Sequence, residues 1–173
     1  AGLVAVWALR LATRIYRKNR GKPEDFRYRA WREAWGDSFL IRSFFQIYML
    51  QGLVIYTVAL PVTLSIIFPM PPIPSLVVSG IALWIIGFFF EALGDRQLDR
   101  FLGDPANKGK IMQSGLWRYT RHPNYFGDFC VWWGLFLLAA ALGAPWWTAA
   151  GPLLMSVLLL RVSGVTLLER SLS

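Results

Sequence analysis

Charged residues are absent from two long stretches of this chain. No Asp, Glu, Lys or Arg occurs from Ser43 to Phe90, or from Phe129 to Leu160. Uncharged apolar stretches of about 18 residues or more are typical of segments that cross a bilayer. In hydrocarbon each backbone polar group needs a partner within the protein, so such segments are helices or strands of a closed barrel. Runs such as IALWIIGFFF lack the alternation of barrel strands, and we therefore predict an all-α, multi-pass transmembrane bundle.

Five apolar segments follow from this pattern, and we predict that they form a single integral membrane domain over residues 1–173. They lie at 1–12, 43–68, 75–93, 125–142 and 146–163. The first is too short to cross a bilayer alone, so we expect the chain to begin inside a helix, with earlier spans of a longer fold missing. Pro61 interrupts the second segment and predicts a kink there.

Basic residues gather between the apolar segments. Ten of the 18 Lys and Arg residues lie between Arg10 and Arg42, and six more lie between Arg96 and Arg121. Cytoplasmic loops of membrane proteins collect Lys and Arg, so we predict that loops 13–42 and 94–124 face the cytoplasm of a bacterial inner membrane. The net charge of +8 would also suit a nucleic-acid-binding protein, but this distribution favours topology, and we expect no nucleic acid.

The first basic loop contains IYRKNRGKPEDFRYRAWREAWGDS, which mixes aromatic with basic side chains. This composition suits a helix that lies at the level of the lipid headgroups, with Lys and Arg reaching anionic lipid. A solvated cytoplasmic loop fits the same composition equally well. Membrane lipids are therefore expected partners of the chain, while the role of this loop stays open.

Three acidic residues follow the third apolar segment at helical spacing. Glu91, Asp95 and Asp99 are separated by four residues each, so they share one face of a helix. A carboxylate near the membrane boundary is costly unless it is paired, and it therefore marks a candidate functional site. The alternative is a purely structural face of ion pairs.

The segment NKGKIMQSGLWRYTRHPNYFGD, at 107–128, combines bases, tyrosines and an amide. Lys and Arg bind phosphate, and the acidic face could accept hydrogen bonds from ribose hydroxyls. A phosphate-bearing nucleotide is therefore a candidate ligand.

His122 is the only histidine, and no pair of cysteines accompanies it, so we predict no metal site. Arg161, near the end of the fifth segment, either snorkels to the interface or reaches into the same pocket.

The motif GLWRYTRHPNYFGD resembles the signature of the steroid 5-alpha-reductase-like membrane family, including its bacterial branch of unknown function. The order of features is also similar: EALGDRQLDRF, the motif loop, a WWG span and LLLRVSGV. The resemblance covers nearly the whole chain. It implies a seven-span helical fold, of which this chain would hold the later two-thirds, and NADPH bound in a cytoplasm-facing cavity. It also implies reduction of a carbon–carbon double bond conjugated to a carbonyl, in a lipid-like substrate such as a steroid or isoprenoid.

The resemblance also implies which residues bind the cofactor. Those at the family's cofactor-contacting places are Asp95, Lys110, Tyr119, Asn124, Tyr125 and Arg161, and those that match the bacterial branch are Arg118, Arg121 and His122. The family's carbonyl-polarising tyrosine and acid lie in earlier spans, so no catalytic residue is assigned, and Glu91 is kept as a candidate.

Two other functions remain open. Arg-His-Pro-x-Tyr is shared with the isoprenylcysteine carboxyl methyltransferases, which bind S-adenosylmethionine in a similar cavity. Their tail usually carries paired glutamates, whereas Leu168 precedes Glu169 here, so the reductase is favoured. The third possibility is a non-catalytic membrane subunit with partner subunits. The substrate and the oligomeric state cannot be read from the sequence.

Overall fold

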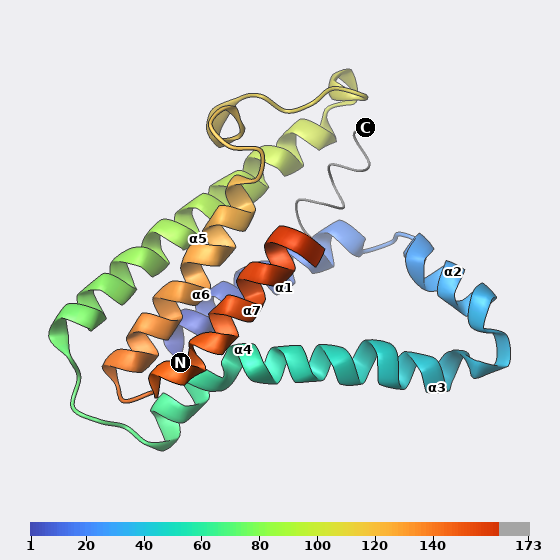
Figure 1. Cartoon of the computed structure of the whole chain (residues 1–173). Helices are drawn as coiled ribbons and strands as arrows, with labels where there is room; N and C mark the ends of the chain where they lie inside the picture. The colour runs from blue at the N-terminus through green and yellow to red at the C-terminus, as the bar shows by residue number, and fades with distance from the viewer. Residues whose placement is uncertain (163–173) are drawn as a thin grey trace. The chain divides into compact units, whose positions relative to one another are not determined.

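The computed structural model describes residues 1–162, and every regular element within that range is a helix (Figure 1). The α-helices are α1 (Gly2–Asn19), α2 (Phe26–Trp35), α3 (Phe39–Ser43), α4 (Leu50–Ile67), α5 (Pro74–Gly103), α6 (Pro123–Ala141) and α7 (Ala150–Val157). Four short 3₁₀ segments are η1 (Gly36–Ser38), η3 (Pro105–Asn107), η4 (Gly115–Arg118) and η5 (Trp146–Ala149). Two π-helical segments are η2 (Phe44–Met49) and η6 (Leu158–Val162). The predicted all-helical class is confirmed for this range.

Two helical stretches are long and apolar enough to cross a membrane by length and composition. They are Phe26–Ile67 and Pro74–Gly103. Both overlap predicted spans, and Pro61 lies inside α4 as the sequence places it. Five spans in all, and a single domain over the whole chain, stay predictions.

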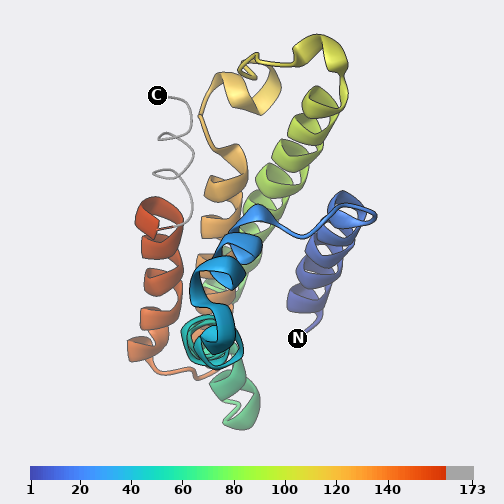
Figure 2. The ribbon, with the colours of Figure 1, turned by 90° about the vertical axis from the view of Figure 1, so that its right-hand side faces the viewer.

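The chain forms two compact units, of which the first is Ala1–Thr57 and the second begins at Val58. In the second unit, α5 and α6 run antiparallel and pack along most of their length, and α6 lies between α5 and α7 (Figures 1 and 2). A hydrogen bond of 3.2 Å from Trp133 Nε1 to Ser156 Oγ joins α6 to α7. This three-helix arrangement positions the candidate site described below.

Glycines allow α5 and α6 to approach closely. They recur every seven residues on the facing sides: Gly80, Gly87 and Gly94 on α5, and Gly127 and Gly134 on α6. A Cβ added at Gly87 would come within 2.6 Å of the carbonyl oxygen of Gly127, and one at Gly127 would collide with the backbone nitrogen of Glu91. Helices in membranes associate by such close packing of small residues, because lipid offers no hydrophobic drive.

The turns at the other end of this helix pair are joined by backbone hydrogen bonds. Met70 N donates to the carbonyl of Leu142 at 2.9 Å, and Ile73 N donates to that of Ala141 at 3.0 Å. These bonds satisfy carbonyls at the end of α6 that no helical partner reaches. They fix the proline-rich turn before α5 against the turn that follows α6.

Candidate functional site

The last turns of α5 carry the three acidic residues that the sequence places on one face. Glu91 and Asp95 are buried, with exposed fractions of 5% and 3%, whereas Asp99 is exposed. Burial of two carboxyl groups requires compensating contacts, because an uncompensated buried charge costs on the order of several kcal/mol. The neighbouring start of α6 supplies one of them.

Asn124 connects α6 to the buried acid of α5. Its Nδ2 donates to Asp95 Oδ1 at 3.3 Å. Because a carboxylate can only accept here, this contact fixes the amide orientation and turns Oδ1 of Asn124 the other way. That oxygen is buried and has no hydrogen-bond partner among residues 1–162. A buried acceptor in this state requires an explanation, and a ligand that donates a hydrogen bond would satisfy it.

The local sequence explains why Asn124 lies at this point. Pro123 occupies the first turn of α6, where its fixed φ favours helix initiation and its missing N–H costs nothing. His122, just before it, adopts an extended φ of −142°, as expected before proline. The rings of His122 and Tyr125 stack at 5.2 Å with an interplanar angle of 22°. The motif His-Pro-Asn-Tyr is therefore a helix start that directs its amide at α5.

The loop between α5 and α6 is fastened onto α5. Leu116 N donates to Gln97 Oε1 at 3.0 Å, and Trp117 Nε1 donates to the carbonyl of Gly94 at 3.0 Å. Gly115 has φ of +61°, and an added Cβ would lie 2.5 Å from the Gln97 amide. Only glycine adopts this conformation readily and leaves room for the amide. The loop is thereby held next to Asp95.

Gln97 and Trp117 were not identified from the sequence as parts of the site. A signal for Trp117 existed, because an indole N–H in a polar loop needs an acceptor. Nothing comparable marks Gln97, whose side chain could equally have remained in solvent. Its role follows only from the path of the loop.

The structure does not bring all of the sequence-derived site residues together. Asp95, His122, Asn124 and Tyr125 gather at the junction of α5 and α6, where none of them is exposed. The other five are exposed: Lys110, Arg118, Tyr119, Arg121 and Arg161. Tyr119 is 84% exposed. The site thus consists of a buried acid–amide contact next to an open basic loop.

Arg161 lies in η6, the π-helical segment that continues directly from α7. Ser156 is level with Trp133 because the two share a hydrogen bond. Since α7 runs antiparallel to α6, Arg161 comes back toward the level of Asp128, in the second turn of α6. The hairpin of α6 and α7 therefore carries Arg161 in the direction of the site.

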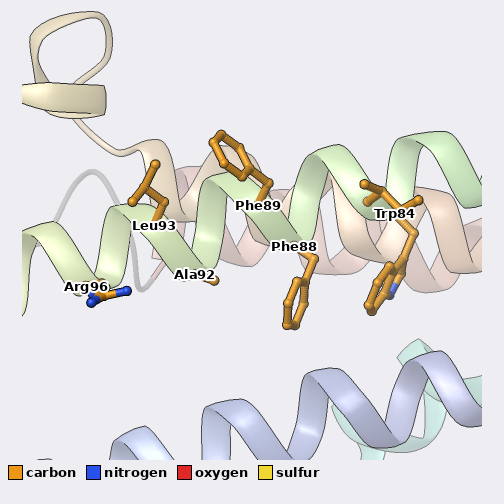
Figure 3. A pocket seen from close by; sticks show the side chains of 7 residues that line it. Trp84, Phe88, Phe89, Ala92, Leu93 and Arg96 are labelled. Carbon is orange, nitrogen blue, oxygen red and sulfur yellow. The ribbon is translucent and has the colours of Figure 1, made fainter.

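An apolar stripe on α5 leads to the same end. Trp84, Phe88, Ala92 and Arg96 recur every four residues and point to one side of the helix (Figure 3). The hollow that these residues line, together with others of α5, has a volume of about 530 Å³. The rings of Trp84 and Phe88 stack at 4.9 Å with an interplanar angle of 13°. The stripe is therefore aromatic in the middle of the helix and basic at the end next to Asp95.

This arrangement suits an amphiphilic or nucleotide-like ligand better than a metal ion. Within residues 1–162 no group of three or more His, Cys, Asp or Glu side chains could hold a metal. Lys and Arg of the loop can bind phosphate oxygens, and the carboxylate of Asp95 and the amide of Asn124 can bind hydroxyl or amide groups. Fold and site together define a helical membrane protein with a candidate binding site for an organic anion at one end of its bundle.

The comparisons with known proteins agree with this class. The chain belongs to the family described as "Protein of unknown function (DUF1295)", whose model matches residues 1–173. It is similar to "3-oxo-5-alpha-steroid 4-dehydrogenase 1" of Mus musculus and of Rattus norvegicus, at 37% identity over 65 residues in each case. The match covers 37% of this chain and 25% of each relative, so it spans about a quarter of their length. No solved structure matches the chain. The predicted membership of the steroid 5-alpha-reductase-like family is confirmed.

Proposed function

We propose that the protein is an NADPH-dependent membrane reductase. Its substrate would carry a carbon–carbon double bond conjugated to a carbonyl on a lipid-like skeleton, such as a steroid or isoprenoid. The observation that carries this proposal is the Asn124–Asp95 contact, with a buried amide oxygen left available beside an exposed basic loop. The names of the similar mammalian proteins, which refer to a 3-oxo steroid, support this reaction class.

The residues present fit NADPH in their chemistry. Asn124 Oδ1 would accept a hydrogen bond from a ribose hydroxyl or from the carboxamide, and the Asp95 carboxylate would accept another. Four exposed cationic side chains would hold the phosphates, and these are Lys110, Arg118, Arg121 and Arg161. NADPH, when bound, supplies the hydride for the reduction. Tyr119, exposed on the loop, offers a ring face and a hydroxyl for the same ligand.

The apolar stripe supports a lipid-like substrate. An elongated apolar molecule lying along Trp84, Phe88 and Ala92 would bury surface against aromatic rings and end next to Asp95 (Figure 3). Glu91 is a buried carboxyl group one turn from Asp95 on α5. It is a candidate for polarising the carbonyl, and we assign no catalytic acid.

The length of α5 supports an integral membrane location. Its 30 residues span about 45 Å at roughly 1.5 Å per residue, whereas the hydrocarbon core is about 30 Å thick. With Pro74 at one boundary, Asp95 would lie near the opposite one. We propose a bacterial inner membrane, with this end and the basic loops on the cytoplasmic side.

Ligand titration of the purified full-length chain in detergent tests the function. We expect saturable NADPH binding, weakened roughly tenfold or more by Arg121→Ala or by Asn124→Ala, because a hydrogen bond to a charged ligand contributes about 1.5–3 kcal/mol. Arg17→Ala, which removes an exposed arginine of α1, is the matched control and should leave the affinity unchanged. The affinity should also fall as salt rises.

The same titration discriminates the other functions. The Arg-His-Pro-x-Tyr motif, at residues 121–125, is the reason to include S-adenosylmethionine. Tighter binding of S-adenosylmethionine than of NADPH would overturn the reductase in favour of a methyltransferase. Binding of neither ligand would favour a non-catalytic subunit.

A further inference from the structure

The first unit carries a ladder of aromatic rings that the proposed reductase site does not use. Tyr28 and Trp31 pack edge to face at 5.4 Å, and Trp31 and Trp35 stack at 5.7 Å with an interplanar angle of 3°. Phe39 of α3 continues the series at 6.1 Å from Trp35. Since residues three, four and seven apart lie on one side of a helix, the rings of Tyr28, Trp31 and Trp35 form one face of α2, and Phe39, beyond the break at Gly36, contacts the last of them. We call these four residues the aromatic face.

The aromatic face is not part of a protein core. Helix α2 contains no buried residue, and Tyr28 and Trp31 keep exposed fractions of 39% and 38%. Ring stacking orders the face but leaves large apolar areas open. Exposed aromatic rows of this kind mark interaction surfaces rather than core.

Arginines border the aromatic face on both sides. Successive residues of a helix turn by about 100°, so Arg27 falls on one border and Arg32 falls on the other, while Arg29 lies further round the helix. Phe26 and Ala30 occupy the opposite side. This pattern, aromatic in the centre and basic at the margins, is that of a helix lying flat in a lipid headgroup layer, with the arginines snorkelling to phosphate.

Acidic residues just before α2 organise two of these arginines. Asp25 caps the helix by accepting from Arg27 N at 2.9 Å, and it binds the Arg27 guanidinium through both oxygens at 3.0 Å. These hydrogen bonds from Arg27 hold the pKa of Asp25 below its usual value, so it stays ionised at neutral pH. Glu24 pairs with Arg32. All four side chains are exposed, and these pairs orient the two arginines.

The charge balance favours an anionic partner. Between Arg10 and Arg42 the chain has ten basic and four acidic residues, a net charge of +6 within a total of +8. We propose that α2 docks on the anionic phospholipid surface of the membrane through its aromatic face. Gly36, with φ of +46°, ends α2 and allows the chain to turn between the surface helix and the apolar helix that follows.

Nitroxide accessibility in nanodiscs tests this proposal on the full-length chain. Single labels are introduced by Tyr28→Cys on the aromatic face and by Ala30→Cys on the opposite side, with Cys130→Ala to remove the native thiol. Nanodiscs contain phosphatidylcholine alone or a mixture with phosphatidylglycerol. In the mixture, we expect label 28 to be shielded from a water-soluble nickel complex and open to oxygen, and label 30 to show the reverse. High salt should reduce the difference.

Matched variants separate the contribution of the arginine charges from that of the aromatic rings. Removal of charge by Arg27→Gln, Arg29→Gln and Arg32→Gln together should abolish the dependence on phosphatidylglycerol, and Trp31→Ala should lose most of the shielding of label 28. Phe26→Ala removes an aromatic ring from the opposite side of the helix and should leave the shielding intact. The line shape of label 30 reports whether α2 persists in each variant.

Three outcomes would overturn the proposal. Labels 28 and 30 that are equally open to nickel would show a solvated loop. Shielding of label 28 that is the same in both lipids would exclude recognition of anionic lipid. Shielding of both labels would indicate a protein partner instead.

Discussion

Asn124 is the residue on which the proposed site depends. Its amide group has two ends, and Asp95 engages only the donor end. The hydrogen bond to Asp95 holds the amide in this orientation and leaves its oxygen buried without a partner among the described residues. A ligand that donates a hydrogen bond there meets a group already held in place, which lowers the entropic cost of binding.

Trp117 is predicted to hold the loop for this ligand. In Trp117→Phe the hydrogen bond to the Gly94 carbonyl is lost while an aromatic ring remains. One such bond contributes about 1 kcal/mol, so we expect roughly fivefold easier opening of the loop. Limited trypsin digestion of the full-length chain in detergent, followed at Arg118 and Arg121, measures this opening.

Trp146→Phe is the control for Trp117→Phe, because Trp146 is 64% exposed at the other end of α6. It should leave cleavage at the loop unchanged. Equal cleavage rates for Trp117→Phe and the unmodified chain would show that the indole bond does not fasten the loop.

At the scale of elements, the α5–α6 pair determines where the site forms. Glycines spaced seven residues apart on both helices let the two backbones meet near Gly87 and Gly127. The same contact places Glu91 against α6 and, one turn further, Asp95 against Asn124. A change in helix separation would therefore act on stability and on ligand binding together.

Gly127→Ala should destabilise the protein. The added methyl group collides with backbone atoms of Glu91, which cannot move aside as a side chain could. Overpacking of this kind costs about 1–3 kcal/mol, so we expect a lower midpoint of thermal unfolding in detergent and weaker NADPH binding.

Gly52→Ala provides the comparison for Gly127→Ala. Gly52 lies inside α4 with nothing within 4 Å of an added Cβ. Alanine favours a helix over glycine by about 0.5–1 kcal/mol, so this variant should match the parent or unfold at a slightly higher temperature. Equal losses in both variants would contradict the close-packing explanation.

At the scale of the whole molecule, the proposed topology places the two ends of α5 on opposite sides of the membrane. In a Cys130→Ala background, Pro72→Cys and Ala106→Cys put single exposed thiols before and after this helix. An impermeant maleimide should label position 72 in intact cells and position 106 only after the membrane is permeabilised. Labelling of both positions in intact cells would contradict the assignment of loop 94–124 to the cytoplasm.

The extent of helical structure was largely readable from residue order. Uncharged stretches too long for any other element predict helices, and α4, α5, α6 and α7 lie at the segments so identified. The helical continuation through Glu91, Asp95 and Asp99 also followed from their spacing. The sequence could not show that Asp99 would be exposed. Residues can share one face of a helix, yet their spacing does not tell how far along that face the neighbouring helix extends.

By itself the sequence determined what kind of elements form, because backbone hydrogen bonding in an apolar chain leaves few choices. It also determined the family, because a motif such as RHPNYFG is a local property of residue order. Only the tertiary structure decided which motif residues meet. The contact of Asn124 with Asp95 joins positions 29 residues apart, and the loop is fastened through Gln97 and Trp117 because two helices with glycine faces approach closely enough to bring its ends together.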